Sequence, residues 1–358
     1  MTRKRVTLAD VARTAEVSST TASLVLSGRG SELRISAPVQ ERVREVARSL
    51  GYRPNIVSVG LRKGSTRTLG FVSDTVATSQ LAGYMIRGAL RAAREHGYML
   101  FIAETEGEHA LEQSLIDLLV DRLVDGIVLA STYTRTRSVP TALAQVPAVL
   151  LNALPQQPQA VVTSVIPDEL EAGRAAARHL LAAGHRRIHL IGAGPQSGDV
   201  PEGGVAAAER LAGIREVLAE AGLEPASGYL CDDWQPAQGW KAMRAVLADH
   251  GPGSAVVTFN DRMALGVYQA VNEAGLSVPG DVSVVSFDDH PVADWLHPGL
   301  STFAIPHEQM GRRAVDLLLR SVESGEPIEP AAVPVRVSMP FRERASLAPS
   351  TGEGRHAV

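Results

Sequence analysis

The side chains best suited to chemistry stand near the start of the chain, in the segment VTLADVARTAEVSSTTASLVLS from Val6 to Ser27. Small hydroxyl groups cluster in its second half, where Ser19, Thr20 and Ser23 share one side of an apolar-striped stretch. Short Ser and Thr side chains let a backbone approach a partner closely, and each can donate or accept a hydrogen bond. This chemistry suits the base edges in a groove of a double helix.

Charge is distributed unevenly along the chain. Residues 1–67 hold 13 Lys and Arg against 5 Asp and Glu, a net charge of +8, whereas the remainder holds 22 against 34, a net charge of −12. A basic first segment on an acidic body is typical of a nucleic-acid-binding module attached to a second function. A solvated basic tail is the alternative, and the helical spacing of apolar residues in this segment argues against it.

The first segment is expected to form helices separated by a tight turn. Thr7 is placed to cap a helix over residues 8–15, with Asp10 completing a capping box. A break at 16–18 precedes a second helix, and a third is expected over 37–50. A helix-turn-helix places side chains near the start of its second helix against base edges. Any three-helix bundle would show similar spacing, so the charge of +8 is what favours DNA.

From Leu69 onward the sequence pattern changes, and short apolar segments typical of strands alternate with Ala-rich segments typical of amphipathic helices. The expected strands are 69–73, 99–103, 126–130, 148–152, 188–192, 255–259 and 282–287. Continuous apolar strands between amphipathic helices indicate parallel sheets covered on both faces. The series begins afresh near 161–168 and is longer than one sheet needs. We therefore expect two doubly wound α/β lobes, with ligands at the carboxyl ends of the strands, in a cleft.

Signals for catalysis are weak. The segment IGAGPQSG at 191–198 resembles a dinucleotide fingerprint, but Ser197 replaces its third glycine and Pro195 interrupts the turn. The sequence has no GxSxG elbow and no Walker A motif. His185 and His189 straddle a turn into a strand, which favours solvated or structural histidines over a metal pair. We expect no cofactor, no metal and no catalytic residue, and hence a protein that is not an enzyme.

Cellular context is read from cysteine and apolar content. Cys231 is the sole cysteine, which excludes a disulfide framework within the chain and fits a reducing compartment. No apolar run follows the basic N-terminus, and none reaches the ~20 residues of a membrane span. The sequence predicts a cytoplasmic protein without a membrane partner.

Several motifs together resemble the lactose-repressor (LacI/GalR) family of bacterial transcriptional regulators. The resemblance rests on VTLADVARTAEVSSTTASLVLSG, YRPN at 52–55, DGIVLAS at 125–131, HLLAAGHRRIHLIG at 179–192, ERLAGIREVLAEAGL at 209–223, FNDRMALGVYQAVNEAGLSVPGDVSVVSFDD at 259–289 and PGLSTFAIPHEQMGRRAVDLLL at 298–319. It implies an N-terminal all-α helix-turn-helix headpiece and a two-lobed body like periplasmic sugar-binding proteins. It also implies a homodimer that reads a pseudo-palindromic double-stranded DNA operator.

The resemblance assigns the DNA-binding positions. Ser19, Thr20 and Leu24 match base-reading positions, and Leu61 matches a leucine that wedges into the minor groove at the centre of the operator. Relatives often carry larger polar groups and an Arg where this chain has Ser19, Thr20 and Leu24. Leu24 cannot pair with guanine but suits a thymine methyl group. The complete set of predicted DNA-binding residues is Thr7, Leu8, Ser18, Ser19, Thr20, Ser23, Leu24, Asn55 and Leu61.

The resemblance also assigns an effector site. Arg210 and Asp288 would bridge adjacent hydroxyls, and Trp234 would offer a face to C–H groups, which suits a sugar. Asn260 and Asp288 have a competing role as helix caps after their strands. The complete set of predicted effector-binding residues is Asp74, Ser79, Ser131, Asn152, Arg210, Trp234, Asn260 and Asp288.

The resulting hypothesis is a transcriptional repressor whose operator affinity is set by a small molecule, expected to be a sugar. Whether the effector releases or promotes DNA binding stays open. A transport-type binding protein, another metabolite sensor and an α/β enzyme are the competing classes. The expected segments are a headpiece at 1–53, a hinge helix and linker at 54–67, a body at 68–347 (N-lobe 68–166 and 303–332, C-lobe 167–298 and 334–347) and a disordered tail at 348–358.

Overall fold

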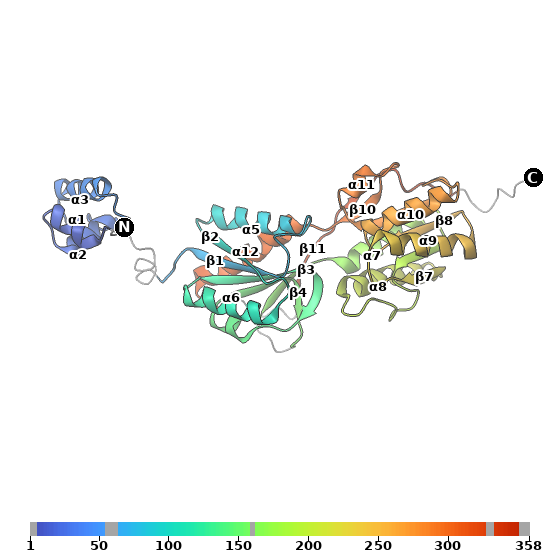
Figure 1. Cartoon of the computed structure of the whole chain (residues 1–358), viewed down its shortest axis with the longest axis horizontal. Helices are drawn as coiled ribbons and strands as arrows, with labels where there is room; N and C mark the ends of the chain where they lie inside the picture. The colour runs from blue at the N-terminus through green and yellow to red at the C-terminus, as the bar shows by residue number, and fades with distance from the viewer. Residues whose placement is uncertain (1–5, 54–63, 158–161, 327–332, 351–358) are drawn as a thin grey trace, which may run out of the picture. The chain divides into compact units, whose positions relative to one another are not determined.

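The computed structural model describes residues 6–53, 64–157, 162–326 and 333–350, which form two compact units, Met1–Arg67 and Thr68–Val358. The first unit holds α1 (Leu8–Thr14), α2 (Ser19–Leu26) and α3 (Ala37–Ser49) (Figure 1). Small and β-branched side chains from all three helices fill its core: Val11, Ala12, Ala15, Ala22, Val25, Val43 and Ala47. The three helices predicted from the sequence are confirmed, each to within one or two residues.

The capping box predicted at the start of α1 is present. The backbone amide of Asp10 donates to Thr7 Oγ1, and the amide of Thr7 donates to Asp10 Oδ2 at 3.0 Å. Ser36 stands at the N-cap position of α3, but its side chain makes no capping hydrogen bond among the described residues. Pro38 in the first turn of α3 carries no N–H, which leaves one donor fewer to satisfy.

The second unit contains two parallel six-stranded sheets, which define an N-lobe and a C-lobe (Figure 1). The N-lobe sheet has the order β11-β5-β4-β3-β1-β2 and the C-lobe sheet β12-β10-β9-β8-β6-β7; only β12 runs antiparallel. The N-lobe strands are β1 (Thr68–Ser73), β2 (Met99–Glu104), β3 (Gly126–Arg137), β4 (Ala148–Pro155), β5 (Thr163–Pro167) and β11 (Val335–Val337). The C-lobe strands are β6 (Ile188–Gly192), β7 (Ser227–Leu230), β8 (Ser254–Thr258), β9 (Val282–Asp288), β10 (Ser301–Ala304) and β12 (Phe341–Arg342). The predicted fold class is confirmed.

Helices cover both faces of each sheet. In the N-lobe, α5 (Gly83–Glu95) and α12 (His307–Ser324) share one core, while α6 (His109–Asp121) and the short 3-10 helix η1 (Thr141–Gln145) share another. In the C-lobe, α8 connects β6 to the edge strand β7, whereas α9 and α10 connect strands in the reverse direction across the sheet, from β7 to β8 and from β8 to β9. Because such crossovers are right-handed, the helix pairs α7·α8 and α9·α10 cover opposite faces of the C-lobe sheet. The C-lobe helices are α7 (Glu169–Ala182), α8 (Val205–Glu220), α9 (Pro236–His250), α10 (Asp261–Glu273) and the short α11 (Val292–Trp295).

Each major helix pair touches backbone to backbone through reciprocal glycines. A Cβ on Gly173 of α7 would lie 2.3 Å from the carbonyl oxygen of Arg210, and a Cβ on Gly213 of α8 would lie 2.2 Å from that of Leu170. The pairs α5·α12 and α9·α10 use glycines in the same way, with the same clash predicted for Gly88, Gly311, Gly239 and Gly266. Only glycine permits such close approach.

The chain crosses between the lobes at 167–168, 305–306 and 338–340. The last two crossings lie later than the predicted lobe boundaries. Ser301–Ala304 is a C-lobe strand paired with β9, and Val335–Val337 is an N-lobe strand paired with β5. The predicted lobe boundaries at 303 and 334 are therefore wrong by a few residues, because these short apolar strands would fit either sheet.

The first residues of the predicted disordered tail, 348–350, contact the C-lobe. His185 Nε2 lies 2.9 Å from the carbonyl oxygen of Ala348, and the amide of Ser350 donates to the carbonyl of Ala183. Residues 348–350 therefore belong to the C-lobe, and His185 has the structural role predicted for it. Residues 351–358 lie outside the described residues. Within the described part of the chain, no helix is both long and apolar enough to cross a membrane.

Candidate DNA interface and effector site

Helix α2 presents hydroxyl groups on the side away from its core. Ala22 and Val25 are buried, whereas Ser19 and Thr20 are exposed. Ser18 caps the helix by accepting a hydrogen bond from the amide of Thr21 at 3.0 Å. This arrangement leaves the first turn of α2 exposed with its small polar side chains outward, as a recognition helix requires.

The remaining predicted DNA-binding residues differ in their burial and in their hydrogen bonds. Ser23, Leu24 and Leu8 are half-buried. Thr7 is exposed, but its hydroxyl already donates to Asp10 Oδ2 at 2.7 Å, so its first role is to fix the start of α1. Asn55 and Leu61 lie outside the described residues.

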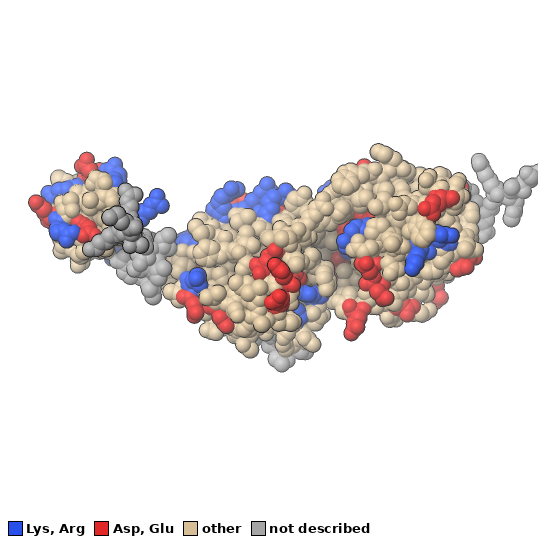
Figure 2. Space-filling view, in the orientation of Figure 1, with Lys and Arg blue, Asp and Glu red and all other residues tan. Residues whose placement is uncertain are grey.

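Several arginines of the first unit are held by acidic neighbours. Arg13 pairs with Asp10, Arg29 with Glu32 at 3.0 Å, and Arg48 with Glu41 at 2.7 Å. All three arginines are exposed, and Figure 2 shows basic and acidic side chains side by side on this unit. Exposed pairs of this kind contribute ~1 kcal/mol or less, so the arginines can exchange a carboxylate for a phosphate at small cost.

In the N-lobe, the polar residues that follow neighbouring strands form one hydrogen-bonded cluster. Asp74 follows β1, and its carboxylate accepts from the amide and hydroxyl of Thr132 at 3.0 and 2.6 Å. Asn152 on β4 donates to the carbonyl of Ser131 at 3.1 Å and accepts from the Thr134 hydroxyl at 2.6 Å. The structure thus brings together three predicted positions, Asp74, Ser131 and Asn152, at the carboxyl edge of the sheet.

Ser79 stands apart from this cluster. Its hydroxyl accepts from the amide of Ala82 at 3.2 Å, just before α5, and its amide donates to the carbonyl of Thr75. These are local contacts that shape the loop after β1. No hydrogen bond between Ser79 and the other predicted effector residues is present in the described part of the chain.

Two arginines of the N-lobe cluster escaped sequence reasoning. Arg135 donates to Asp74 Oδ2 at 2.9 Å and to the Ser131 hydroxyl at 3.3 Å. Arg137 is buried, pairs with Glu112 of α6, and lies 3.4 Å from the Ser131 hydroxyl. The alternating run TYTRTR after DGIVLAS was the signal for both, since β3 continues through it with a bulge after Ala130. Alternation places Arg135 and Arg137 on the same face of that strand.

The C-lobe cluster centres on Arg210 of α8, which is 2% exposed. Its guanidinium forms a two-pronged ion pair with Glu169 of α7, at 2.6 Å from Nε and 2.8 Å from Nη2. A third donor, Nη1, binds the carbonyl of Phe259, and the guanidinium carbon stands 4.5 Å from the centre of the Phe287 ring. Glu169 was not predicted, although its place as the first residue of α7 on a buried helix face was visible in the sequence.

Asn260 and Trp234 support one another as well as the site. Asn260 caps α10 by accepting from the amide of Met263 at 2.8 Å, and it donates to the carbonyl of Trp234 at 3.0 Å. The indole of Trp234 donates to the carbonyl of Gly192 at 3.2 Å. The helix-cap role considered for Asn260 is therefore present, and both polar atoms of its side chain are occupied.

Asp288 differs from its neighbours because its carboxylate accepts no hydrogen bond from the described residues. The closest cation is Arg210, whose Nη2 lies 3.8 Å from Asp288 Oδ1. Its backbone has a φ of 117°, which is sterically strained for any residue with a Cβ. Strain of this kind is found where function requires a particular side-chain position. Unlike Asn260, Asp288 does not cap a helix.

A second buried acid stands nearby. Asp261, the first residue of α10, accepts from the hydroxyl of Thr302 and the amide of His290, both at 2.7 Å. Burial raises the pKa of both Asp261 and Asp288, and each charge adds to the cost of ionising other acids in this cluster. The cluster can therefore hold a proton near neutral pH, a property that the sequence did not reveal.

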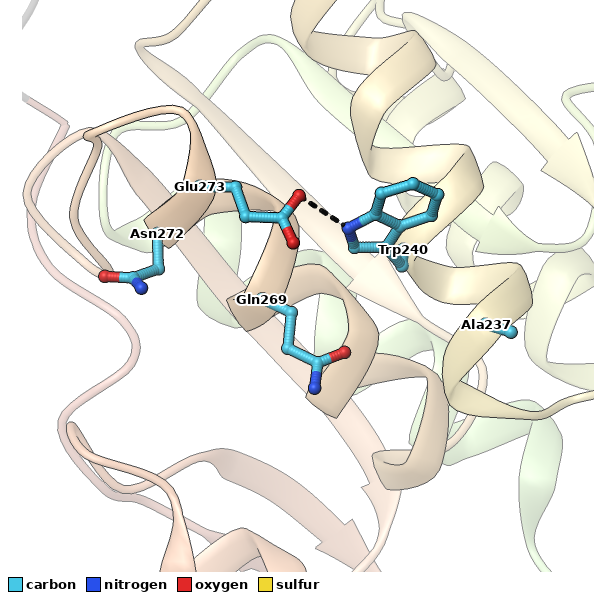
Figure 3. A pocket seen from close by; sticks show the side chains of 5 residues that line it. All are labelled: Ala237, Trp240, Gln269, Asn272 and Glu273. Carbon is cyan, nitrogen blue, oxygen red and sulfur yellow. Dashed lines mark hydrogen bonds between the residues drawn. The ribbon is translucent and has the colours of Figure 1, made fainter.

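A pocket of about 460 Å³ lies elsewhere, on the outer side of α9 and α10 (Figure 3). Trp240 forms one wall and donates to Glu273 at 2.9 Å, and the open rim carries the amides of Gln269 and Asn272. None of the predicted effector residues lines this pocket. Within the described residues, no cluster of three or more His, Cys, Asp or Glu is arranged to hold a metal ion.

Comparison with known proteins assigns both units. Residues 7–55 match the family described as bacterial regulatory proteins, lacI family, and residues 177–347 match a periplasmic binding protein-like domain. The ribose operon repressor of Escherichia coli (strain K12) is 32% identical over 320 residues, which span 88% of this chain and 93% of the repressor. The chain belongs to the LacI family. It is accordingly a DNA-binding transcriptional regulator of the kind controlled by small-molecule effectors.

Further relatives within the LacI family agree. The HTH-type transcriptional repressor PurR of Vibrio campbellii (strain ATCC BAA-1116) is 31% identical, over 89% of this chain and 93% of PurR. Among solved structures, the lac repressor dimer bound to operator and the anti-inducer ONPF aligns with a TM-score of 0.76 at 25% identity, over 96% of this chain and all of that one. The complex of the regulator CelR with cellobiose aligns with a TM-score of 0.64 at 29% identity, over 96% and 100%.

Proposed function

We propose that this LacI-family regulator is a homodimeric, non-enzymatic repressor of the cytoplasm, whose effector is a sugar bound by the polar clusters at the carboxyl ends of both sheets. The main support for a sugar as the effector is the environment of Asp288. Its carboxylate has no hydrogen-bond donor among the described residues, while Arg210 beside it is already neutralised by Glu169. A ligand with hydroxyl groups supplies donors to Asp288 and acceptors to the remaining N–H groups of Arg210.

The N-lobe cluster supplies the opposite side of the proposed site. Asp74 accepts hydrogen bonds from four donor groups of its own neighbours, which fixes its position before any ligand arrives. Arg135, about a quarter exposed, keeps donors for a ligand oxygen. Fixed polar groups of this kind favour a ligand with a defined set of hydroxyls over an apolar one.

The homodimer is supported by the outer edge of the N-lobe sheet. The edge strand β2 exposes Met99, Phe101 and Ile102, which are 59%, 41% and 43% exposed. An uncovered apolar edge strand is a liability that proteins cover with another chain. The solved lac repressor relative is a dimer on its operator, and two headpieces per dimer would read the two halves of a pseudo-palindromic site.

The proposed function is tested by footprinting the protein on DNA that flanks its own gene and then titrating in D-ribose, D-galactose, D-glucose and cellobiose, with a purine base as the non-sugar arm. A salt-sensitive two-fold symmetric footprint that one sugar alters supports the proposal. Asp288→Asn should keep the footprint and lose the sugar response. A footprint that responds only to the purine base would overturn the sugar, and the absence of any footprint would overturn the operator-binding repressor.

A further inference from the structure

Arg336 lies on β11, the N-lobe strand that precedes the last crossing between the lobes. Its guanidinium binds Glu209 of the C-lobe helix α8 with two prongs, at 2.8 Å from Nη1 and 2.7 Å from Nη2. The same Nη1 lies 3.7 Å from Asp168 at the start of α7. Arg336 and Glu209 are 28% and 20% exposed at their side chains, so solvent screens this pair only in part.

The acids that hold Arg336 are the chain neighbours of the residues at the effector site. Glu209 precedes Arg210 on α8, and Asp168 precedes Glu169 on α7. Arg210 and Glu169 form the buried ion pair of the C-lobe cluster. The starts of α7 and α8 are therefore joined twice, once inside the C-lobe by Glu169 and Arg210, and once through the N-lobe strand by Arg336.

The crossing segments reinforce this connection. Strand β11 pairs in parallel with β5, with Arg336 opposite Ile166, and the amide of Asp168 donates to the carbonyl of Val337 at 2.9 Å. The first and third crossings thus run next to one another, and Arg336 reaches from them to α8. A change in the angle between the lobes that moves β11 away from α8 would therefore break this pair.

We propose that Arg336 is a positioning residue, which couples the placement of Arg210 and Glu169 to the arrangement of the two lobes through its ion pair with Glu209. The pair holds the lobe arrangement described above, and its loss releases α8 from β11. This inference rests on the proposed function only for its consequence, the effector response. The mechanical part, that the pair sets the arrangement of the lobes, stands on the contacts alone.

A matched control exists on the same helices. Arg174 of α7 binds Glu216 of α8 at 3.0 and 2.8 Å, and its side chain is 28% exposed, as is that of Arg336. That pair lies wholly within the C-lobe and makes no contact with β11. Arg174→Met therefore removes a two-pronged ion pair between α7 and α8, together with the contact of Arg174 to Glu171, without touching a crossing segment.

The experiment measures the distance between the lobes in the full-length protein. Cysteines for nitroxide labels are introduced by Leu118→Cys in the N-lobe helix α6 and Glu220→Cys in the C-lobe helix α8, at positions that are both exposed. The labelled protein is mixed with an excess of unlabelled protein, so that each labelled dimer carries one labelled protomer. Cys231 is 3% exposed, and burial raises the pKa of its thiol, so labelling of the native cysteine is disfavoured. Pulsed electron resonance then gives the distance distribution for the wild type, Arg336→Met, Glu209→Gln, the double variant and Arg174→Met.

We expect Arg336→Met and Glu209→Gln to shift or broaden the distribution alike, the double variant to add nothing further, and Arg174→Met to match the wild type. Arg336→Lys keeps the charge and loses the two-pronged geometry, so its distance distribution should lie between those of the wild type and Arg336→Met. Distributions that are identical in wild type and Arg336→Met would overturn the proposal, as would equal shifts from Arg336→Met and Arg174→Met.

A second arm separates this proposal from the proposed function. The operator affinity of the wild type and of Arg336→Met is measured with and without D-ribose and the other sugars of the footprint screen. For any sugar that changes the operator affinity of the wild type, we expect the ratio of the affinities with and without that sugar to be smaller in Arg336→Met by fivefold or more. If the wild type responds to no sugar, the proposed effector class fails, while the distance measurement still decides the role of Arg336. If Arg336→Met keeps the wild-type ratio of operator affinities with and without sugar, Arg336 does not couple the effector site to the lobe arrangement.

Discussion

Gly173 of α7 faces the backbone of Arg210 so closely that a Cβ on Gly173 would stand 2.3 Å from the Arg210 carbonyl oxygen and 2.9 Å from its Cα. Because no neighbouring flexible side chain can yield, an added methyl group has to push the two helices apart. The ion pair between Arg210 and Glu169, one turn earlier on α7, depends on this approach.

Gly173→Ala should therefore weaken effector binding by tenfold or more and lower the stability of the C-lobe by ~1–3 kcal/mol, a typical cost of overpacking. Calorimetric titration and thermal unfolding measure the two effects. Gly83→Ala is the matched control, because a Cβ there would meet only the Val76 carbonyl at 3.7 Å, an ordinary contact. Equal effects of both substitutions would show that helix approach does not govern the site.

Glu169→Ala and Arg210→Met should each destabilise the protein. Either substitution leaves one charge of the buried pair, whose side chains are 1% and 2% exposed, without its partner, which costs ~3–5 kcal/mol. Chemical denaturation of both variants and the wild type gives the comparison. The DNA-binding unit is a separate compact unit, so operator affinity without effector should persist in Arg210→Met. Loss of operator binding in that variant would contradict the assignment of Arg210 to the effector site.

Glu112 and Arg137 form a second buried ion pair, with side chains 8% and 5% exposed. The Nε of Arg137 has no hydrogen-bond partner among the described residues, so the pair is only partly satisfied. Replacing Glu112 alone with Ala should cost ~3–5 kcal/mol, whereas Glu112→Leu combined with Arg137→Met should cost much less. Urea denaturation of the single and double variants checks this. A double variant as unstable as Glu112→Ala would show that the charges themselves are needed.

Two buried histidines should make the body sensitive to acid. Burial lowers the pKa of His189 and of His307 to about 4, so between pH 6.5 and 4 the unfolded chain binds protons that the folded chain does not. Their contribution to stability is full above pH 6.5 and is lost as the pH falls towards 4. Asp261 and Asp288, whose pKa values are raised, act in the opposite direction, so the histidine effect must be measured as a difference between variants.

His307→Gln should accordingly lose less stability than the wild type on acidification from pH 7 to pH 4.5, with a difference on the order of 2 kcal/mol. Urea denaturation at a series of pH values gives the measurement. His109→Gln, at an exposed position on α6, serves as the control and should follow the wild-type profile. A parallel profile for His307→Gln and wild type would exclude His307 as a source of acid sensitivity.

Local signals in the sequence predicted the helices of the first unit and the longer strands of both lobes. Thr7 and Asp10 lie three residues apart, and the capping box depends only on that spacing. The strand β9 is buried as far as Phe287 and ends with Asp288, and a parallel sheet places such a residue at its carboxyl edge. In each of these places, local chemistry and the final fold require the same residues.

The rest depended on contacts between distant parts of the chain. Glu169 and Arg210 are 41 residues apart, and their pairing follows from glycines that no local pattern marks as contact points. Asp261 is the first residue of α10, and one of its hydrogen bonds comes from Thr302 on β10, far along the chain. The later lobe crossings were misplaced because β10 and β11 have only four and three residues, too few to show which sheet they join.

The uncovered strand at the rim of the N-lobe has a practical consequence for anyone who dilutes the protein. A lone subunit would carry Met99, Phe101 and Ile102 on a free β-edge, a surface that adheres to any similar strand it meets. Dilution should thus yield turbid or adsorbed material in place of well-behaved single subunits, and a charged side chain at Phe101 would be the direct remedy.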